Sequence, residues 1–367
     1  MKITRNRILT LVAAAMFAGF LVYAQSSFNP YLLRIMNLCA IFSIFAVTFN
    51  LIFGYTGQFS LGHAGFAGVG AYVAALLTMT AAQKNANFFL TPIIPLLAQV
   101  QWPFLPAMLL GGLLAAIMGF LVGWPALRLR GDYLAIATLG FGEIARVLFV
   151  NMQRVTNGSL GLKGIPEYTN VYWSWGLAVV TIVVTKRLVD SSYGRALKAV
   201  RDDEVAAEAL GVRLSYHKLL AFTLSSFFVG IAGALLANLI STIDPKVFFF
   251  FLTYQVIGIT VVGGMASLTG STVAACLFTV FLELLRPIES PFNIGPLQVP
   301  GVPGMRMVIF SILLLLTILF FRRGLFGQRE FSWDLLFRRA SALRARIIGI
   351  KELKPTPSVG SEKEKVG

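Results

Sequence analysis

Glu143 and Arg146 place two opposite charges inside an apolar stretch, where a charge needs a chemical or structural reason. Each charge inside a membrane-crossing helix costs roughly 2.5–3.5 kcal/mol on insertion scales. The two residues stand three positions apart, so on a helix they share a face and can pair. They form either a structural pair that neutralises itself or a polar spot that faces a path for a solute. Glu283 and Arg286 repeat the spacing near the end of an apolar stretch, where snorkelling favours the structural interpretation.

Most catalytic and cofactor motifs are missing from the sequence. There is no G-x-x-x-x-G-K-[ST] phosphate loop, so we expect no ATP hydrolysis by that chemistry on this chain. With two histidines, two cysteines (Cys39 and Cys276) and no HExxH pair, we expect no metal site, no disulfide framework, no bound cofactor and no enzymatic activity. The string GFGEIA at 140–145 matches a dinucleotide pattern, but it lies in an apolar stretch with no strand before it. We expect its glycines to let helices approach closely, as do the pairs Gly119/Gly123, Gly230/Ala234 and Gly233/Ala237.

Residues 54–72, GYTGQFSLGHAGFAGVGAY, are dense in glycine. Glycine at this density weakens a helix and lets the backbone approach a neighbour or a solute. A broken helix that lines a cavity and a close packing of small residues fit this composition equally well. We expect the start of this segment to face the helix that contains Glu143 across a solute path. The candidate path residues are Gly57, Gln58, Ser60, Gly62, His63, Tyr133, Thr138, Gly140, Glu143 and Arg146.

The charged segment RALKAVRDDEVAAEALGV at 195–212 interrupts two long apolar stretches, and four of the sixteen acidic residues lie between Asp202 and Glu208. We expect two short helices, SSYGRALKAV and DDEVAAEALG. Acidic residues favour the positive N-terminal end of the second, and Gly211 fits its C′ position. A solvated loop needs no capped helix with small residues on one side, so we predict docking into another protein. The candidate docking residues are Asp202, Asp203, Glu204, Ala206, Ala207, Glu208 and Gly211.

Composition places these features in a membrane protein. The 367 residues are 57% hydrophobic, and the mean hydropathy is +0.77. Apolar runs near the roughly 20 residues of a membrane-crossing helix recur throughout, and inside lipid a helix satisfies every backbone polar group internally. We therefore predict an all-α polytopic membrane protein with about ten transmembrane helices. They are expected at about 8–23, 33–53, 60–80, 104–127, 133–150, 171–185, 219–240, 248–263, 268–285 and 305–321.

The net charge of +15 follows from where the basic residues lie. If the N-terminus is inside, 23 of the 31 basic residues fall in inside segments, which is the positive-inside pattern. Nucleic-acid binding is not needed to explain the charge, and none is expected. Residues 1–24 also look like a signal peptide, but we favour a retained first helix.

Residues 1–325 are expected to form the transmembrane domain, with the docking segment at about 186–218. Residues 326–367 are expected to form a basic cytoplasmic tail, with an amphipathic helix on the inner leaflet and a disordered end. On the other side, TNGSLGLKGIP at 156–166 is a turn-rich loop, either a contact for an external partner or a simple connector. Its candidate contact residues are Asn157, Gly158 and Gly161.

Several of these segments together resemble a known family. DEVAAEALGV resembles the EAA-type coupling element of ABC-importer membrane subunits, with Ala206, Ala207 and Gly211 at matching places. The segments GYTGQFSLGHAGFAGVGAYVAALL, RLRGDYLAIATLGFGEIARVLFVN, TNGSLGLKGIP and VVGGMASLTG resemble the M-type permease of bacterial branched-chain amino-acid importers. The resemblance covers residues 30–325. Ala266, where the family usually has glycine, and the long basic tail depart from it.

The resemblance implies an ABC-importer permease fold with a cytoplasmic coupling helix, in the bacterial inner membrane with both termini in the cytoplasm. It implies a heterodimer with a paralogous H-type permease and two ATPase subunits that bind the ATP and magnesium. A periplasmic binding protein would deliver leucine, isoleucine or valine. The same family also serves urea, short amides and other amino acids, so the solute stays open. A self-sufficient secondary transporter, coupled through intramembrane charges, is the rival class, and the capped helix argues against it.

Overall fold

The computed structural model describes residues 2–129, 131–289, 292–294, 297–299, 304–320, 324–327 and 330. The chain divides into two units, one of residues 13–330 and one of residues 1–12 with 331–367. In the second unit only residues 2–12 are described, and they are helical. The predicted amphipathic helix and disordered end of the tail lie outside the described residues.

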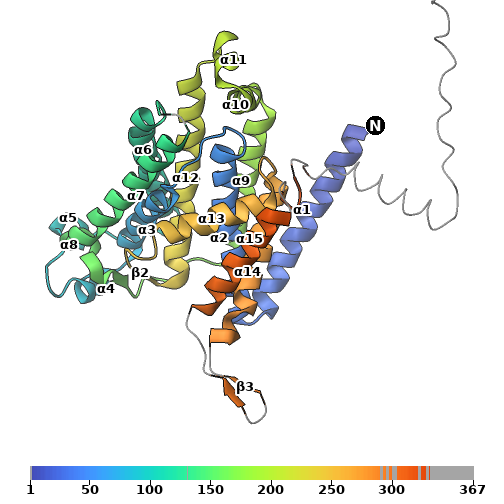
Figure 1. Cartoon of the computed structure of the whole chain (residues 1–367). Coiled ribbons are helices and arrows are strands. Elements are labelled where there is room, and N and C mark those ends of the chain that lie inside the picture. Colours follow the sequence, from blue (N-terminus) through green and yellow to red (C-terminus); the bar gives the residue numbers. More distant parts are fainter. Residues whose placement is uncertain are drawn as a thin grey trace, which may run out of the picture. The chain divides into compact units, whose positions relative to one another are not determined.

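Helices lie at all ten places where the sequence predicts an apolar span (Figure 1). They are α1 (Lys2–Ser27), α2 (Pro30–Phe53), α3 (His63–Thr78), α6 (Phe104–Ala126), α7 (Asp132–Asn151), α9 (Val171–Asp190), α12 (Leu214–Ile240), α13 (Phe250–Gly263), α14 (Leu268–Leu284) and α15 (Met305–Phe320). Among the described helices, α1, α2, α6, α7, α12 and α14 contain stretches long and apolar enough to cross a membrane, and α3, α13 and α15 contain shorter apolar ones. The prediction of an all-α polytopic membrane protein is confirmed.

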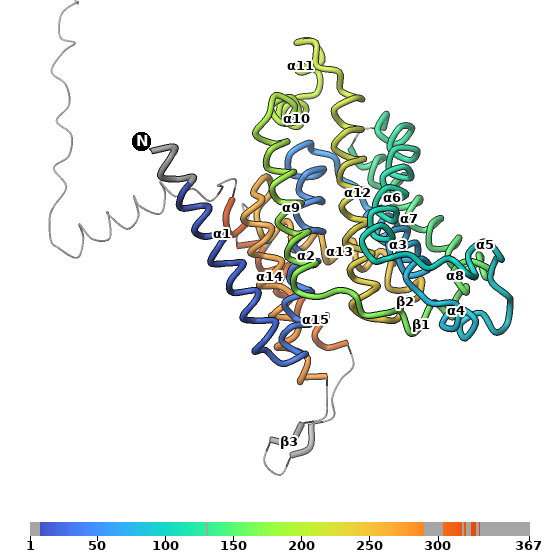
Figure 2. Tube along the Cα trace, turned by 180° about the vertical axis from the view of Figure 1, so that it is seen from behind, coloured from blue at the N-terminus to red at the C-terminus, as the bar shows by residue number. Residues whose placement is uncertain are grey.

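The connections contain short elements, of which the sequence predicted only the two short helices of the charged segment. At one end of the bundle lie α4 (Ala81–Asn87), α5 (Pro95–Ala98), α8 (Gln153–Thr156), the 3-10 turn η1 (Gly158–Leu160), and the antiparallel strands β1 (Leu162–Lys163) and β2 (Thr242–Ile243). At the opposite end lie α10 (Ser192–Asp202) and α11 (Glu204–Ala209), as both views show (Figure 1, Figure 2). We call these the α4 end and the α11 end. Between α14 and α15 lie η2 (Arg286–Glu289) and the paired strands β3 (Phe292–Ile294) and β4 (Leu297–Val299).

The centre of the bundle is a crossing of α3, α6 and α12 at which backbones touch. A Cβ added to Gly70 would collide with the carbonyl of Gly230, and one added to Gly111 would lie 2.8 Å from the carbonyl oxygen of Gly70. One turn along α12, a Cβ on Gly233 would collide with the backbone of Ala67. Lipid supplies no hydrophobic drive between helices, so packing at this contact has to hold them together. The predicted close approach at Gly230 and Gly233 is confirmed.

The two glycines of GFGEIA behave differently from each other. Gly142 lies at a helix contact, since an added Cβ would be 3.7 Å from the Cα of Gly62. The same expectation for Gly140 is wrong: an added Cβ meets nothing within 4 Å, and the residue lies on the exposed face of α7. Residues two positions apart in a helix lie about 200° apart around its axis, so only one of Gly140 and Gly142 can face the bundle.

The predicted span at 60–80 is also only partly helical. Residues 57–62 are irregular, and α3 begins at His63. Irregular backbone at membrane depth is tolerated only where protein encloses it or where it lines a cavity. The backbone of the glycine-rich segment is therefore a broken helix, as the first interpretation predicted. Its glycines also pack closely against neighbouring elements, as the second interpretation predicted.

The buried amide of Asn50 ties α2 to the turn between α13 and α14. Its Oδ1 accepts from the N–H of Ala266 at 2.8 Å. Its Nδ2 donates to the carbonyl of Ser267 at 2.9 Å and to the hydroxyl of Ser271 at 2.7 Å. Ala266 has a φ of 64°, a left-handed conformation that favours glycine. The alanine that departs from the family pattern thus lies in a strained turn held by Asn50.

The segment that follows α15 returns to the same turn. The N–H of Leu325 donates to the carbonyl of Val262 at 2.8 Å. The carboxylate of Glu330 accepts from the N–H of Leu268 at 2.6 Å and from the hydroxyl of Tyr55 at 2.8 Å. Leu268 begins α14, so this anion lies where the helix dipole favours it. Burial, together with the Glu330 carboxylate, raises the pKa of Tyr55.

Replacing Gly70 by alanine is expected to lower the thermal midpoint of the purified protein, because its Cβ collides with the α12 backbone. Overpacking of this kind costs about 1–3 kcal/mol. Gly176→Ala in α9 is the matched control, since an added Cβ there meets nothing within 4 Å and the gain in helix propensity is the same. Melting in detergent, followed by size-exclusion chromatography, compares the two variants. Equal midpoints would contradict a tight crossing.

Candidate functional site

The second helix of the charged segment, α11, is closed at both ends by its own residues. Asp203 is the N-cap, and its carboxylate accepts from two backbone N–H groups of the first turn, at 2.8 and 3.0 Å. At the other end Gly211 has a φ of 84°. The N–H of Gly211 donates to the carbonyl of Glu208, and the next N–H donates to that of Ala207. These two bonds form a Schellman motif, which confirms the predicted C′ position of Gly211.

The side of α11 that its alanines predict for docking is only partly exposed. Ala207 is buried against the rest of the chain, whereas Ala206 is exposed. The large apolar side chains of Val205 and Leu210 are 66% and 84% exposed. Sequence reasoning missed both, because an apolar residue in a helix reads as a core residue until its exposure is known. Val205 lies in α11 and Leu210 is its C-cap, so both exposed apolar side chains lie at the α11 end, where burial against another protein would remove them from water.

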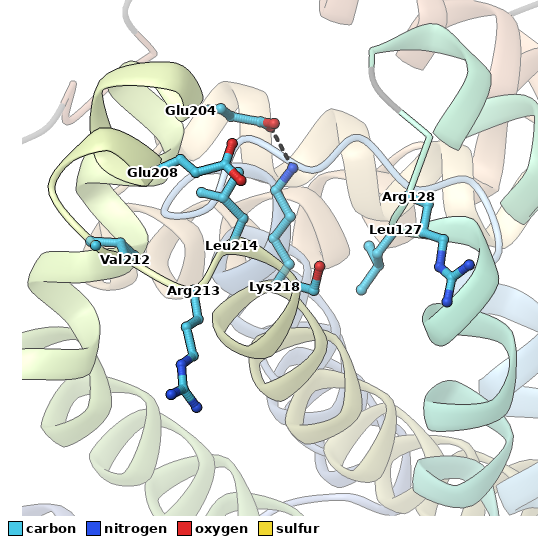
Figure 3. A pocket seen from close by; sticks show the side chains of 10 residues that line it. Leu127, Arg128, Glu204, Glu208, Val212, Arg213, Leu214 and Lys218 are labelled. Atoms are coloured by element: carbon cyan, nitrogen blue, oxygen red, sulfur yellow. Dashed lines mark hydrogen bonds and ion pairs between the residues drawn. The ribbon is translucent and has the colours of Figure 1, made fainter.

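A buried ion pair fixes α11 to the start of α12. Lys218 Nζ lies 2.5 Å from a carboxylate oxygen of Glu204, with 7% of the lysine side chain and 31% of the glutamate side chain exposed. Both residues line a pocket of about 490 Å³ between α11, the start of α12 and the end of α6 (Figure 3). Burial of an ammonium group is costly unless an opposite charge lies beside it, and Glu204 supplies that charge. Lys218 was not among the predicted docking residues, since no local spacing links it to Glu204.

A second contact joins the charged segment to the glycine-rich segment. Arg201 donates from Nη1 to the carbonyl of Gly54 at 3.0 Å and pairs with Asp202 at 2.7 Å. Gly57, with a φ of 70°, lies against the same arginine: an added Cβ would be 3.3 Å from its Cγ. Asp202 is the last residue of α10, and its carboxylate orients Arg201. The sequence placed Asp202 in the first turn of the second helix, and that prediction is wrong. A shift of α10 would reach Gly54 and Gly57 through this contact.

The glycine-rich segment and α7, which were expected to face each other, are in direct contact. The N–H of Leu61 donates to the hydroxyl of Thr138 at 2.9 Å. A Cβ on Gly62 would lie 2.7 Å from the carbonyl oxygen of Thr138. The side chains of Ser60 and Thr138 are both fully buried. In this conformation the contact is closed at these residues, and its place along a solute path stays a prediction.

Two further polar side chains of this segment are buried. His63 begins α3, its Nε2 lies 3.5 Å from the hydroxyl oxygen of Thr48, and its ring packs edge-on against Phe49. His63 is therefore a bonded core residue. Gln58 lies nearer the α11 end, where it lines a second pocket that includes Lys218.

The predicted pairing on α7 is confirmed. Arg146 Nε lies 2.9 Å from Glu143 Oε2, and the guanidinium lies 5.6 Å from the ring centre of Phe249. The side chains are 33% and 38% exposed, so the pair lies at the edge of the packing of this chain. Tyr133 and Gly140, two other candidate path residues on α7, are exposed as well.

The loop predicted to meet an external partner is closed on itself at the α4 end. Asn157 has a φ of 61°, and its Nδ2 donates to the carbonyl of Gly161 at 2.8 Å. Asn157 and Gly158 are buried, and Gly161 packs against the backbone of Ile243. These three residues set the shape of the loop, while Leu160 between them is 44% exposed and is available for contact.

This geometry can be compared with known proteins. The family described as "Branched-chain amino acid transport system / permease component" matches residues 31–318. The chain belongs to this family. The high-affinity branched-chain amino acid transport system permease protein LivM of Escherichia coli (strain K12) is 36% identical over 301 residues, which cover 72% of this chain and 66% of that protein. LivM of Salmonella typhimurium gives the same values, so the chain spans just under two thirds of the length of these relatives.

More distant relatives extend the comparison. The probable LivM of Methanocaldococcus jannaschii is 23% identical over 319 residues, 79% of this chain and 91% of that one. The autoinducer 2 import system permease protein LsrC of an Enterobacter species is 28% identical over 214 residues, 57% of this chain and 61% of that one. No solved structure matches the chain.

Family membership makes this chain a multi-pass membrane permease and a transport subunit rather than an enzyme. Among the described residues, no group of three or more His, Cys, Asp or Glu side chains is placed to hold a metal ion. The ion pairs and caps described above therefore belong to a permease of this family.

Removing the carboxylate of Glu204 is expected to destabilise the protein, because the buried ammonium of Lys218 then lacks this opposite charge. The loss from Glu204→Gln should be about 3 kcal/mol, the low end for buried pairs, since the glutamate is partly exposed. Glu204→Gln combined with Lys218→Met removes both charges and is expected to regain most of the thermal midpoint.

The pair of Glu283 and Arg286 provides the control, because its cation is exposed. Arg286 is 61% exposed, so Glu283→Gln leaves a solvated guanidinium and is expected to change stability by less than about 1 kcal/mol. Thermal melting of the single and double variants measures both pairs. A double variant no more stable than Glu204→Gln alone would show that the buried pair does not hold α11.

Proposed function

We propose that this chain is the transmembrane permease subunit of an ATP-driven importer for branched-chain, neutral aliphatic amino acids. The observation that supports this most is α11, a helix capped at both ends, anchored by Lys218 and presenting Val205 and Leu210 at one end of a permease bundle. A secondary transporter couples through ions held within its own spans and has no use for such a helix. The importer class accounts for it as the docking site of an ATPase.

In this proposal the chain works in a larger assembly. It pairs with a paralogous H-type permease, and α11 docks on one of two ATPase subunits, which bind the ATP and magnesium. This chain binds no cofactor of its own. A periplasmic binding protein delivers the solute at the α4 end, near the loop of Asn157 and Gly161.

The proposed location is the bacterial inner membrane, with both chain termini and the α11 end in the cytoplasm. The orientation is supported by seven basic residues between Lys186 and Lys218, because the positive-inside rule places such clusters in the cytoplasm. It also puts α11 in the compartment where ATP is available.

The contacts of α11 and α10 suggest how a movement of the ATPase would be transmitted to the residues of the proposed solute path. A displacement of α11 acts on α12 through Glu204 and Lys218. The neighbouring helix α10 acts on Gly54 through Arg201. The segment that starts there packs against α7 through Leu61 and Thr138, and we infer that this contact opens and closes during transport.

Leu210→Asp is expected to abolish ATPase binding, because it puts a charge into the apolar surface that α11 offers. Leu96→Asp is the matched control, since Leu96 is 79% exposed on α5 at the opposite end of the bundle. Co-purification of ATPase subunits with the tagged permease is the measurement. The amount of co-purified ATPase is expected to fall at least tenfold for Leu210→Asp and to stay unchanged for Leu96→Asp. Full ATPase binding by Leu210→Asp would refute the docking role.

The solute is tested by uptake into proteoliposomes that contain the permease pair, the ATPases and the binding protein. Leucine, isoleucine and valine are expected to enter in an ATP-dependent manner, because burial of each aliphatic CH₂ contributes about 0.8 kcal/mol of binding. Urea and autoinducer 2, which lack an aliphatic side chain of this kind, serve as control solutes and are expected to enter at background rates. Uptake driven by an ion gradient without ATP would favour the secondary-transporter class.

A further inference from the structure

A pocket at the α11 end contains a buried polar side chain without a partner. Gln58 is 2% exposed, and within the part of the chain that the structure describes neither its Oε1 nor its Nε2 has a hydrogen-bond partner. A buried polar group in this state costs about 1–3 kcal/mol. The backbone nevertheless holds the residue in place, because the Gln58 N–H donates to the carbonyl of Ile52 at 2.8 Å. The amide is thus kept available for a group from outside the chain.

The surrounding pocket has a volume of about 320 Å³, at the lower end for small-molecule sites. Its lining residues are Phe53, Gly57, Gln58, Phe59, Leu129, Gly131, Asp132, Leu134, Glu204 and Lys218. These described residues contribute two carboxylates and one ammonium, which disfavours a purely anionic ligand. The remaining walls are largely aromatic and aliphatic, which suits an apolar group. The lining therefore fits a small molecule that carries both charges and an aliphatic side chain.

We propose that this pocket, the Gln58 pocket, binds a neutral aliphatic amino acid as its zwitterion. The inference rests on the proposed importer function and adds to it a binding site at the release end. The amide of Gln58 offers Nε2 to the ligand carboxylate and Oε1 to the ligand ammonium. Asp132 supplies negative charge for the ammonium, and Lys218, which stays paired with Glu204, adds positive charge on the carboxylate side. Phe53 and Phe59 cover the aliphatic side chain.

The position of the pocket connects the solute to the coupling element. Gly57 and Gln58 belong to the segment that contacts Arg201 of α10, and Glu204 and Lys218 form the anchor of α11. An amino acid in the Gln58 pocket touches both segments at once. Its binding and release therefore depend on the position of α11, which the ATPase sets.

The test uses the complete permease–ATPase complex in lipid nanodiscs, without binding protein and without nucleotide. Equilibrium binding of radiolabelled leucine is measured by scintillation proximity. Leucine is expected to bind. Two analogues are expected to compete at least tenfold more weakly than unlabelled leucine: leucinamide, which lacks the carboxylate, and 4-methylpentanoate, which lacks the ammonium. Gln58→Leu is expected to weaken leucine binding roughly tenfold or more, because two hydrogen bonds to charged groups are lost.

Thermal stability distinguishes a binding role of Gln58 from a structural one. A Gln58→Leu variant that binds leucine poorly should melt at or above the midpoint of the unmodified complex, because the unpartnered amide is gone. Gln99→Leu is the matched control, an exposed glutamine after α5 whose replacement leaves leucine binding unchanged. Asp132→Asn, at the exposed first residue of α7, tests the site independently. It should lower the affinity for leucine about threefold and leave the affinity for 4-methylpentanoate unchanged.

The outcomes separate the pocket from the importer function. Unchanged leucine affinity in both Gln58→Leu and Asp132→Asn overturns the Gln58 pocket. A complex that imports leucine with its binding protein but shows no leucine binding here also overturns the pocket and leaves the importer function standing. A complex that imports no branched-chain amino acid overturns the importer function itself.

Discussion

The bundle depends on the backbone contact at which α3, α6 and α12 cross. Gly70, Gly111 and Gly230 meet there, and none of them has room for a side chain. Helices in lipid gain little from hydrophobic burial against each other, so close packing of this kind has to hold them together. Because the crossing fixes α3, the segment before it can leave helical geometry while protein still encloses it. The irregular residues 57–62 and everything they touch follow from this arrangement.

Two polar contacts extend from the fixed centre to the α11 end. The pair of Glu204 and Lys218 holds α11 on α12, and Arg201 holds α10 on the backbone at Gly54. Both contacts use a long side chain to join elements that meet at the edge of the bundle. A charge buried in this way is stable only with its partner in place, so the pair of Glu204 and Lys218 resists separation. The two contacts thus connect α11 with α12, and α10 with the start of the glycine-rich segment.

The structure also keeps groups that reduce stability at this end of the bundle. Ala266 occupies a left-handed turn that would suit glycine, and the buried amide of Gln58 has no hydrogen-bond partner among the described residues. Strain and unpaired polar groups of this kind persist where the surrounding packing holds them, and they concentrate at working sites. The bonds of Asn50 and the tight crossing provide that packing here. Stability in the centre of the fold therefore permits unfavourable local chemistry close to α10 and α11.

The sequence alone determined the features that depend on neighbours within a turn or on the run of apolar residues. These are helices at the ten predicted places, the end of α11 at Gly211, and the pairing of Glu143 with Arg146. Only the tertiary structure decided which side of a helix meets the bundle, so Gly142 is packed while Gly140 is exposed. It also decided the long-range pairs, such as Lys218 with Glu204, and buried the Gln58 amide with no partner in the part of the chain that the structure describes. The reason is physical: caps and helices are local in the chain, whereas burial and exposure are set by elements far away in the sequence.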